Sequence, residues 1–271
     1  MLTFNLARCC SGFALLLILL SVVACRRDDG GVIRINPKSF SAEDEAAIGR
    51  RLLSERWRSE DLNIIRPNSD AFTDAAFVYL EGLTRALIEQ PSVTRRDSFD
   101  WEISLVLDEE AHAYTLPGGK IVLHTGLLHS IENEAECVGI LAREVALAEQ
   151  GAAMAALDRE VEDNVTLGDM ILGNLVPLDH IIETLPRLTY TAEELIRADS
   201  LAARLVCPTD YQELALLDAA GRLPLTTPYR LARPAEEGWE RIFTQRVSAC
   251  LGADSLYTGR YQEVLDAYVP N

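Results

Sequence analysis

The chain has 271 residues, 48% of them hydrophobic, so it is long and apolar enough to bury one substantial core. Its formal net charge of -17 argues against nucleic acid or an anionic membrane surface as a partner, because binding to phosphate groups needs clustered Lys and Arg. An acidic, solvated surface explains this charge, and we expect no nucleic-acid partner.

The first 25 residues resemble the signal peptide of a bacterial lipoprotein. Arg8 is their only charged residue, an apolar run extends from Phe13 to Leu20, and the segment closes on Val22-Val23-Ala24-Cys25. The run is shorter than the roughly 20 residues that span a bilayer, and a small residue precedes the cysteine, as cleavage requires. We expect residues 1–24 to be removed and Cys25 to carry lipid. An ordinary secretory signal and an uncleaved anchor are the alternatives.

A lipidated Cys25 would anchor the protein in a bacterial cell envelope. Arg26 follows it, whereas lipoproteins kept at the inner membrane usually carry Asp there, so we expect the periplasmic side of the outer membrane. Residues 25–38 are polar and contain Gly30-Gly31, which predicts a tether.

Three cysteines lie beyond this segment. An oxidising compartment permits a disulfide between two of them. We expect Cys207 to pair with Cys250, because Cys137 falls on the apolar face of a predicted helix.

Two helices are predicted after the tether. The first begins near Ser41, whose hydroxyl can cap it while the acidic residues that follow favour its positive end, and it continues through Leu53. The second covers about Asp70 to Gln90, where apolar residues recur at helical spacing, and Pro91 ends it.

A small sheet is predicted next. Trp101 to Leu107 alternates and is rich in β-forming residues, and Tyr114 to Leu116 and Lys120 to His124 are further extended runs. Pro117-Gly118-Gly119 forms a turn between the last two, so they should make a hairpin.

The pattern is helical from Gly126 onward. After one short helix, a long helix is expected from Glu134 to about Leu157, and another from Ala192 to Val206. The remaining residues have a helical and irregular pattern without a repeat.

Several short motifs follow one another in a specific order between Ser41 and about Leu205. They are Glu45-Ala46-Ala47-Ile48-Gly49, His112 to Val122 with its Pro-Gly-Gly turn, Thr125-Gly126-Leu127-Leu128, Glu134 to Ala142, and Ala198-Asp199. In this order they resemble the zinc metallopeptidase family that contains HtpX, BepA and the CAAX prenyl endopeptidases, peptidase family forty-eight. The resemblance implies an α+β fold, mainly helical and zincin-like, with a small sheet and hairpin beside the active-site helix. Residues 39–207 would form this domain, and residues 208–271 a helical extension packed on it.

The zinc ligands of that family are missing. Active members hold zinc with the two histidines of HExxH and with a glutamate on a later helix, and at those positions this chain has Arg143, Leu147 and Leu195. Arginine is permanently charged and leucine has no lone pair, so none of the three binds Zn²⁺. Glu194 does not replace Leu195, because one residue along a helix turns the side chain by about 100°.

Only the general base of the motif, Glu144, is retained, and without a metal it cannot activate water or polarise a carbonyl. We therefore predict no zinc, no other cofactor and no peptidase activity. His124 and His129 are interpreted as surface or structural residues, since no zinc-type spacing joins them.

The replacements also suggest a rebuilt site. In active relatives the aspartate at position 199 orients the first histidine, so Asp199 is expected to accept a charge-assisted hydrogen bond from Arg143. Leu147 and Leu195 would face one another and fill the former metal position.

Three functions remain open from the sequence. The first is a lipid-anchored, inactive homologue that acts as a binding or regulatory module in envelope protein quality control. It would bind an envelope protein or unfolded polypeptide by β-addition in a groove beside the strand Lys120, Ile121, Val122, Leu123 and His124. The second is an active metalloendopeptidase with an unconventional site around Glu144 and Asp199. The third is a structural lipoprotein whose groove has closed.

Overall fold

The computed structural model describes residues 32–34, 41–56, 63–65, 71–156, 159, 175–177, 190–222, 244 and 253–268. The predicted signal peptide, Cys25 and Cys250 lie outside these residues. In the part of the chain that is described, no helix is both long and apolar enough to cross a bilayer. Strand β1 (Val32–Arg34) lies within the predicted tether and forms a separate two-stranded sheet with β6 (Leu175–Pro177).

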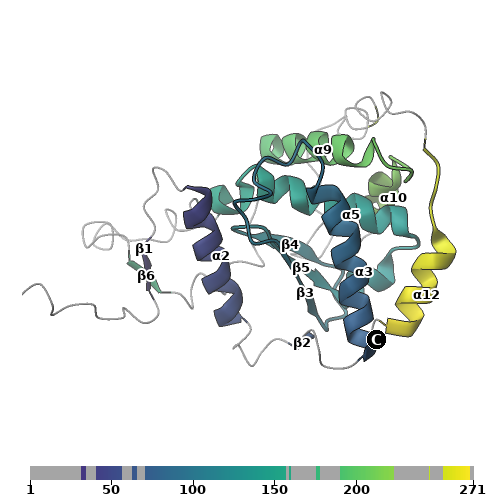
Figure 1. The fold of residues 1–271 in the computed structure, drawn as a ribbon, viewed down its shortest axis with the longest axis horizontal. Helices are drawn as coiled ribbons and strands as arrows, with labels where there is room; N and C mark the ends of the chain where they lie inside the picture. Colours follow the sequence, from purple (N-terminus) through teal and green to yellow (C-terminus); the bar gives the residue numbers. More distant parts are fainter. Residues whose placement is uncertain are drawn as a thin grey trace, which may run out of the picture. The chain divides into compact units, whose positions relative to one another are not determined.

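A mixed four-stranded sheet in the order β2-β3-β5-β4 is the centre of the fold (Figure 1). Strands β5 (Lys120–His124) and β3 (Glu102–Val106) are parallel, whereas β4 (Ala113–Leu116) pairs antiparallel with β5 in the predicted hairpin. The two-residue β2 (Ile64–Ile65) pairs antiparallel with β3. Strand β5 therefore has a neighbour on each side, and β4 is an outer strand.

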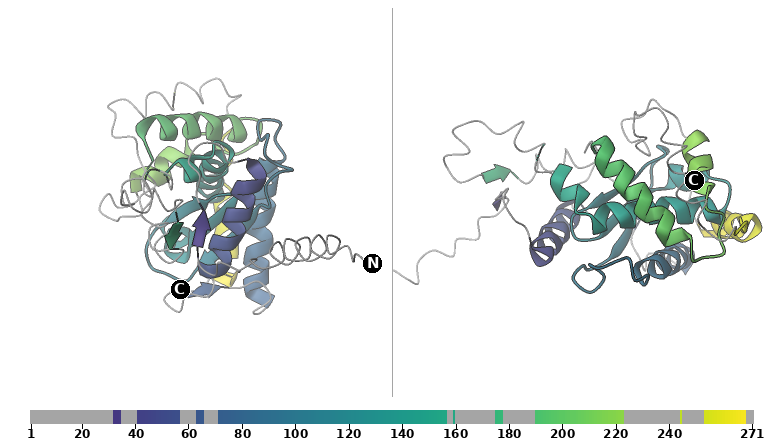
Figure 2. Two further views of the ribbon diagram at one scale, coloured as in Figure 1. Left: turned by 90° about the vertical axis from the view of Figure 1, so that its left-hand side faces the viewer. Right: turned by 90° about the horizontal axis from the view of Figure 1, so that it is seen from above.

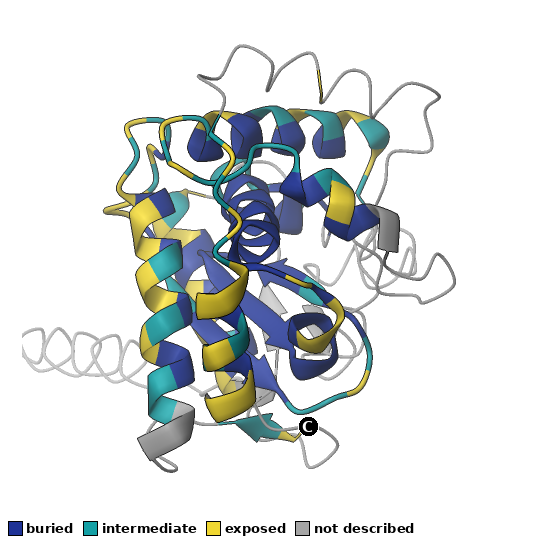
Figure 3. Cartoon of the chain, turned by 90° about the vertical axis from the view of Figure 1, so that its right-hand side faces the viewer, coloured by how far each residue is buried: buried dark blue, intermediate teal, exposed yellow. Residues whose placement is uncertain are grey.

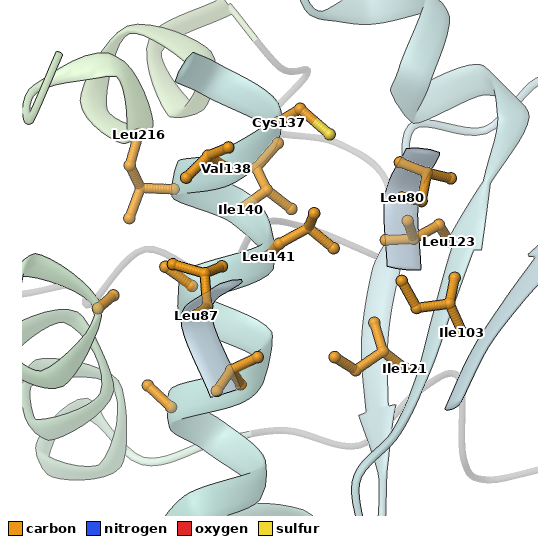
Figure 4. Close-up of a cluster of buried hydrophobic side chains, with 14 of the residues drawn as sticks. Leu80, Leu87, Ile103, Ile121, Leu123, Cys137, Val138, Ile140, Leu141 and Leu216 are labelled. Atoms are coloured by element: carbon orange, nitrogen blue, oxygen red, sulfur yellow. The ribbon is translucent and has the colours of Figure 1, made fainter. Parts of the chain in front are cut away.

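Two helices, α3 (Ala71–Ile88) and α5 (Glu134–Glu149), pack against this sheet and contribute to its main apolar core. Figure 4 shows apolar side chains from α3 and α5 packed between the helices and strands β3 and β5. The sheet contributes alternate residues to this core, as the period of a strand requires: Ile103, Leu105, Ile121 and Leu123.

Helix α2 (Ala42–Arg56) is anchored to the hairpin turn. Ser41 caps it as predicted, because the Ser41 hydroxyl accepts a hydrogen bond from the Asp44 N–H at 3.2 Å. Gly49 lies so close to the turn that a Cβ there would come 1.8 Å from the Pro117 carbonyl oxygen. Gly49, the last residue of the first motif, must therefore be glycine, because the Pro-Gly-Gly turn of the second motif leaves no room for a Cβ.

The remaining helices pack around α5. Helix α9 (Ala192–Val206) lies against α5, as the views in Figure 2 show, α10 (Ala215–Arg222) also contacts α5, and α12 (Thr258–Tyr268) lies beside α3. The short α4 (Thr125–Ser130) follows β5 directly. The fold is thus α+β and mainly helical, as expected from the sequence.

The predicted extent of α5 needs correction. The helix ends at Glu149 rather than near Leu157, and helical structure resumes only at Ala152. Gly151 adopts a positive φ of 66°, a conformation that ends helices and that glycine enters without steric cost. Alanine-rich sequence on both sides of this glycine concealed the break.

Candidate functional site

Helix α5 carries the candidate site and is buried on all sides. Every residue from Glu134 to Ala148 is buried, because the sheet, α3, α9 and α10 surround the helix (Figure 3). Any charged side chain on this helix must therefore find a partner inside the protein or remain neutral.

Arg143 and Asp199 form the ion pair that the sequence predicted. Arg143 Nε lies 2.8 Å from Asp199 Oδ1, and Arg143 Nη2 donates a hydrogen bond to Asp199 Oδ2 at 3.3 Å. The shorter contact is poorly aligned for a hydrogen bond, so it is an electrostatic contact rather than a second hydrogen bond. The two side chains are 1% and 3% exposed. The pair thus joins the centre of α5 to the centre of α9 away from water.

Leu147 and Leu195 are also buried, on α5 and α9 respectively. Leu147 belongs to the main apolar core. Neither side chain offers a lone pair, so two of the three family ligand positions cannot coordinate a zinc ion. The predicted contact between Leu147 and Leu195 themselves stays a prediction.

Glu194 is engaged away from the Leu195 position. Its carboxylate accepts two hydrogen bonds from Arg159, at 2.8 and 2.9 Å, and it also closes the capping box of α9 with Thr191. Burial alone would raise its pKa, but the hydrogen bonds and charge of Arg159 together with the hydrogen bonds of Thr191 outweigh burial and leave the pKa of Glu194 below its ordinary value. No local sequence pattern predicts that Arg159 binds Glu194, since Arg159 and Glu194 are 35 positions apart.

Glu144 differs from the other acidic residues of the site. It is 4% exposed, and among the described residues none donates a hydrogen bond to its Oε2. Burial raises the pKa of Glu144 to about 7, although the positive charge of Arg143 opposes this rise. Burial and the charges of Glu144 and Glu194 likewise raise the pKa of Tyr190.

Strand β4 lies over this part of α5. The Thr115 hydroxyl donates a long hydrogen bond of 3.4 Å to the backbone carbonyl of Glu144. Thr115 is fully buried. The outer strand of the sheet therefore passes directly beside the retained glutamate.

The predicted groove strand must be corrected. Residues Lys120 to His124 were expected to accept a polypeptide at their edge, but β5 pairs with β3 on one side and with β4 on the other. Both sets of its backbone groups are already used, and all five residues are buried. A strand could be added only to an outer strand, and β4 is the outer strand beside α5.

The histidines give no zinc-type arrangement in the described residues, where no group of three or more His, Cys, Asp or Glu could hold a metal ion. His124 is buried, stacks with His112 at a ring distance of 4.7 Å, and has Nδ1 3.4 Å from Asp108 Oδ2. His129 is exposed. His124 is therefore a buried structural residue, and His129 is a surface residue.

Of the two described cysteines, Cys207 is disulfide-bonded, and its predicted partner Cys250 lies outside the described residues. Cys137 is free and buried in the core, as expected.

A second buried acid was not foreseen. Glu134, at the start of α5, is fully buried and accepts hydrogen bonds from Tyr79 at 2.6 Å, from Tyr211 at 2.5 Å and from Arg260. No local sequence pattern predicts this cluster, because Arg260 is 126 residues away from Glu134. This cluster connects α5 to α3 and α12 at the end of the helix opposite Arg143.

The Arg143–Asp199 pair predicts strong coupling in a double-mutant cycle. Arg143→Met and Asp199→Asn should each lower the free energy of unfolding by about 3–5 kcal/mol, since each leaves a buried group without its partner. The free energy of unfolding of the double variant should fall by clearly less than the sum of the two single losses. Urea denaturation of the four proteins measures this. Arg197→Met, which removes the exposed Glu193–Arg197 pair of the same helix, is the control and should change stability by less than about 1 kcal/mol. Additive single losses would contradict the coupling.

The raised pKa of Glu144 predicts a pH-dependent stability. The folded protein retains a proton that the unfolded chain releases above about pH 4.5, so this contribution is complete below that pH and is lost as the pH rises through about 7. Glu144→Gln should therefore be as stable as the parent at about pH 4.5 and more stable above pH 7, by an upper limit of about 3 kcal/mol. Urea denaturation over this range checks the difference, with Glu193→Gln as the exposed control. Equal stability of parent and Glu144→Gln at every pH would contradict a buried, protonated Glu144.

Comparison with known proteins agrees with this fold. The model of peptidase family M48 matches residues 75–154, the segment that contains most of α3, strands β3, β4 and β5, and α5. The mitochondrial metalloendopeptidase OMA1 of Arabidopsis thaliana is 29% identical over 132 residues, which are 49% of this chain and 25% of that relative. The match thus spans a quarter of the relative's length. Together with the order of the motifs and the α+β fold, these matches support membership of the described domain in peptidase family M48.

Proposed function

We propose that this chain is a pseudopeptidase, a lipid-anchored member of family M48 that holds no zinc and binds a polypeptide without cleaving it. The buried Arg143–Asp199 ion pair is the observation that carries this proposal. A guanidinium occupies the position of the first zinc-binding histidine, and a positive charge there repels Zn²⁺ as well as failing to bind it.

The other two zinc-ligand positions of the family have also lost their coordinating groups. Leu147 and Leu195 cannot coordinate a metal, and Glu194 is held by Arg159. In family M48 zinc supplies the activated water and the polarised carbonyl, and Glu144 alone supplies neither. The alternative, an active endopeptidase with an unconventional site at Glu144 and Asp199, is less well supported because Asp199 is already paired with Arg143.

The edge of β4 is the surface that we assign to polypeptide binding. The N–H of His124 donates to the His112 carbonyl at 2.9 Å, so the residues whose backbone groups point toward β5 are His112, Tyr114 and Leu116. The N–H and C=O groups of Ala113 and Thr115 consequently point away from the sheet. Ala113 is the partly exposed residue of β4, whereas Thr115 is fully buried, so an extended polypeptide would pair with the outward groups of Ala113. From there an added strand would run toward Thr115, which contacts Glu144.

The cellular setting of the proposal rests on the sequence. The apolar run before Cys25 and the absence of Asp after it support an outer-membrane lipoprotein facing the periplasm. Unfolded or partly folded envelope proteins are the polypeptides available there, which favours a role in envelope protein quality control.

Metal content tests the loss of zinc. The purified full-length protein should contain zinc far below one ion per chain by mass spectrometry, because Arg143, Leu147 and Leu195 occupy the three ligand positions of the family. It should leave unfolded casein uncleaved, and Glu144→Gln should leave both results unchanged. Stoichiometric zinc, or casein cleavage that Glu144→Gln abolishes, would favour the active endopeptidase.

A proline at the edge of β4 tests the binding surface. Ala113→Pro removes an outward N–H while keeping the hydrogen bonds from β4 to β5, so binding of unfolded casein should weaken about fivefold to twentyfold through the lost hydrogen bond. Fluorescence anisotropy measures the affinity, and circular dichroism verifies the fold. Ala113→Ser keeps the N–H at the same position and should bind like the parent. Unchanged binding by a folded Ala113→Pro variant rules out β-addition at this edge.

A further inference from the structure

The charged groups around the rebuilt site form pairs, with one exception. Arg143 pairs with Asp199, and Arg159 pairs with Glu194. Each cation is thus opposed by a carboxylate on or beside α9. Glu144 is the remaining carboxyl, and among the described residues no cation forms an ion pair with it within 4.0 Å. Among the described residues, the nearest cation to an ionised Glu144 along the chain is Arg143, and Arg143 is already paired with Asp199.

The geometry of Glu144 also indicates an unfilled hydrogen-bond position. Its side chain is more than nine-tenths buried, and its Oε2 receives no hydrogen bond from any described residue. Buried carboxylate oxygens are nearly always satisfied, because removing them from water without a partner is costly. A proton, a water molecule or a bound cation can fill this position.

We propose that Glu144 binds one positive charge, the side-chain ammonium of a lysine in the polypeptide held along β4. This inference rests on the proposed binding function, because Thr115 of β4 contacts the backbone of Glu144 and places an added strand next to it. The retained glutamate is then a binding residue rather than a remnant of lost chemistry.

The single unpartnered oxygen of Glu144, Oε2, indicates which class of cation it would bind. One free oxygen matches a compact ammonium, which donates single hydrogen bonds, better than a guanidinium, whose planar fork is suited to both oxygens of a carboxylate. A divalent metal is disfavoured because Arg143 is adjacent and, among the described residues, no second and third ligand accompanies Glu144. Binding of an ammonium also requires the ionised carboxylate, so it should strengthen above neutral pH.

The first arm of the test uses n-butylammonium chloride as a probe that does not depend on polypeptide binding. At about pH 8, where Glu144 is ionised, the salt should raise the thermal midpoint of the full-length protein more than sodium chloride of equal ionic strength does. The difference should vanish at about pH 5 and in Glu144→Gln, and it should persist in Glu193→Gln, whose carboxyl is 81% exposed in the parent. Equal midpoints in the two salts, or a difference that survives Glu144→Gln, would overturn the inference.

The second arm uses extended peptides that differ only at one central residue, Lys, Arg or Gln. The lysine peptide should bind about tenfold more tightly than the glutamine peptide, and Glu144→Gln should abolish this preference without weakening the glutamine peptide. Equal affinities of the lysine and glutamine peptides would refute the lysine assignment while leaving the proposed function intact, and a preference for arginine would refute the choice of ammonium. If no peptide binds, the proposed function fails, and the butylammonium arm still decides whether Glu144 binds a cation.

Discussion

Complete burial of α5 is the constraint on which the rest of the site depends. The sheet, α3, α9 and α10 enclose this helix, so a charge on it cannot be solvated. Arg143 is tolerated because Asp199 lies opposite it on α9, and Glu134 is tolerated because Arg260 and two tyrosines surround its carboxylate. In active members of the family a zinc ion would supply positive charge at the same centre, and in this chain a guanidinium does.

The Arg143–Asp199 pair provides a link between the two helices that needs no metal. A zinc ion joins two helices by coordination, and the Arg143–Asp199 pair joins α5 to α9 by an ion pair with one hydrogen bond. The Arg159–Glu194 pair adds a second link near the start of α9. Glu144 is the one acidic group of the helix centre that this rearrangement leaves without a counter-charge, which is why its protonation state matters for both stability and binding.

Position within the sheet decides which strand can meet a partner. The sequence places a hairpin correctly, but its two strands look equally suited to accept an added strand. Parallel pairing of β3 with β5 occupies the second edge of β5 and leaves β4 outermost. Strands β3 and β5 are separated along the chain by β4 and its turns, so no local sequence pattern predicts their pairing.

The sequence by itself determined the features that depend on local chemistry and on motif order. Residue type and helical period predicted the capped start of α2 and the span of α9. The resemblance of the ordered motifs to the peptidase family implied the α+β fold, the loss of the three zinc ligands and the partnership of Arg143 with Asp199. Only the tertiary structure decided which groups are buried and what lies against them. The interior place of β5, the break at Gly151, the capture of Glu194 by Arg159 and the isolation of Glu144 all depend on contacts between distant segments, and such contacts are set by packing rather than by neighbouring residues.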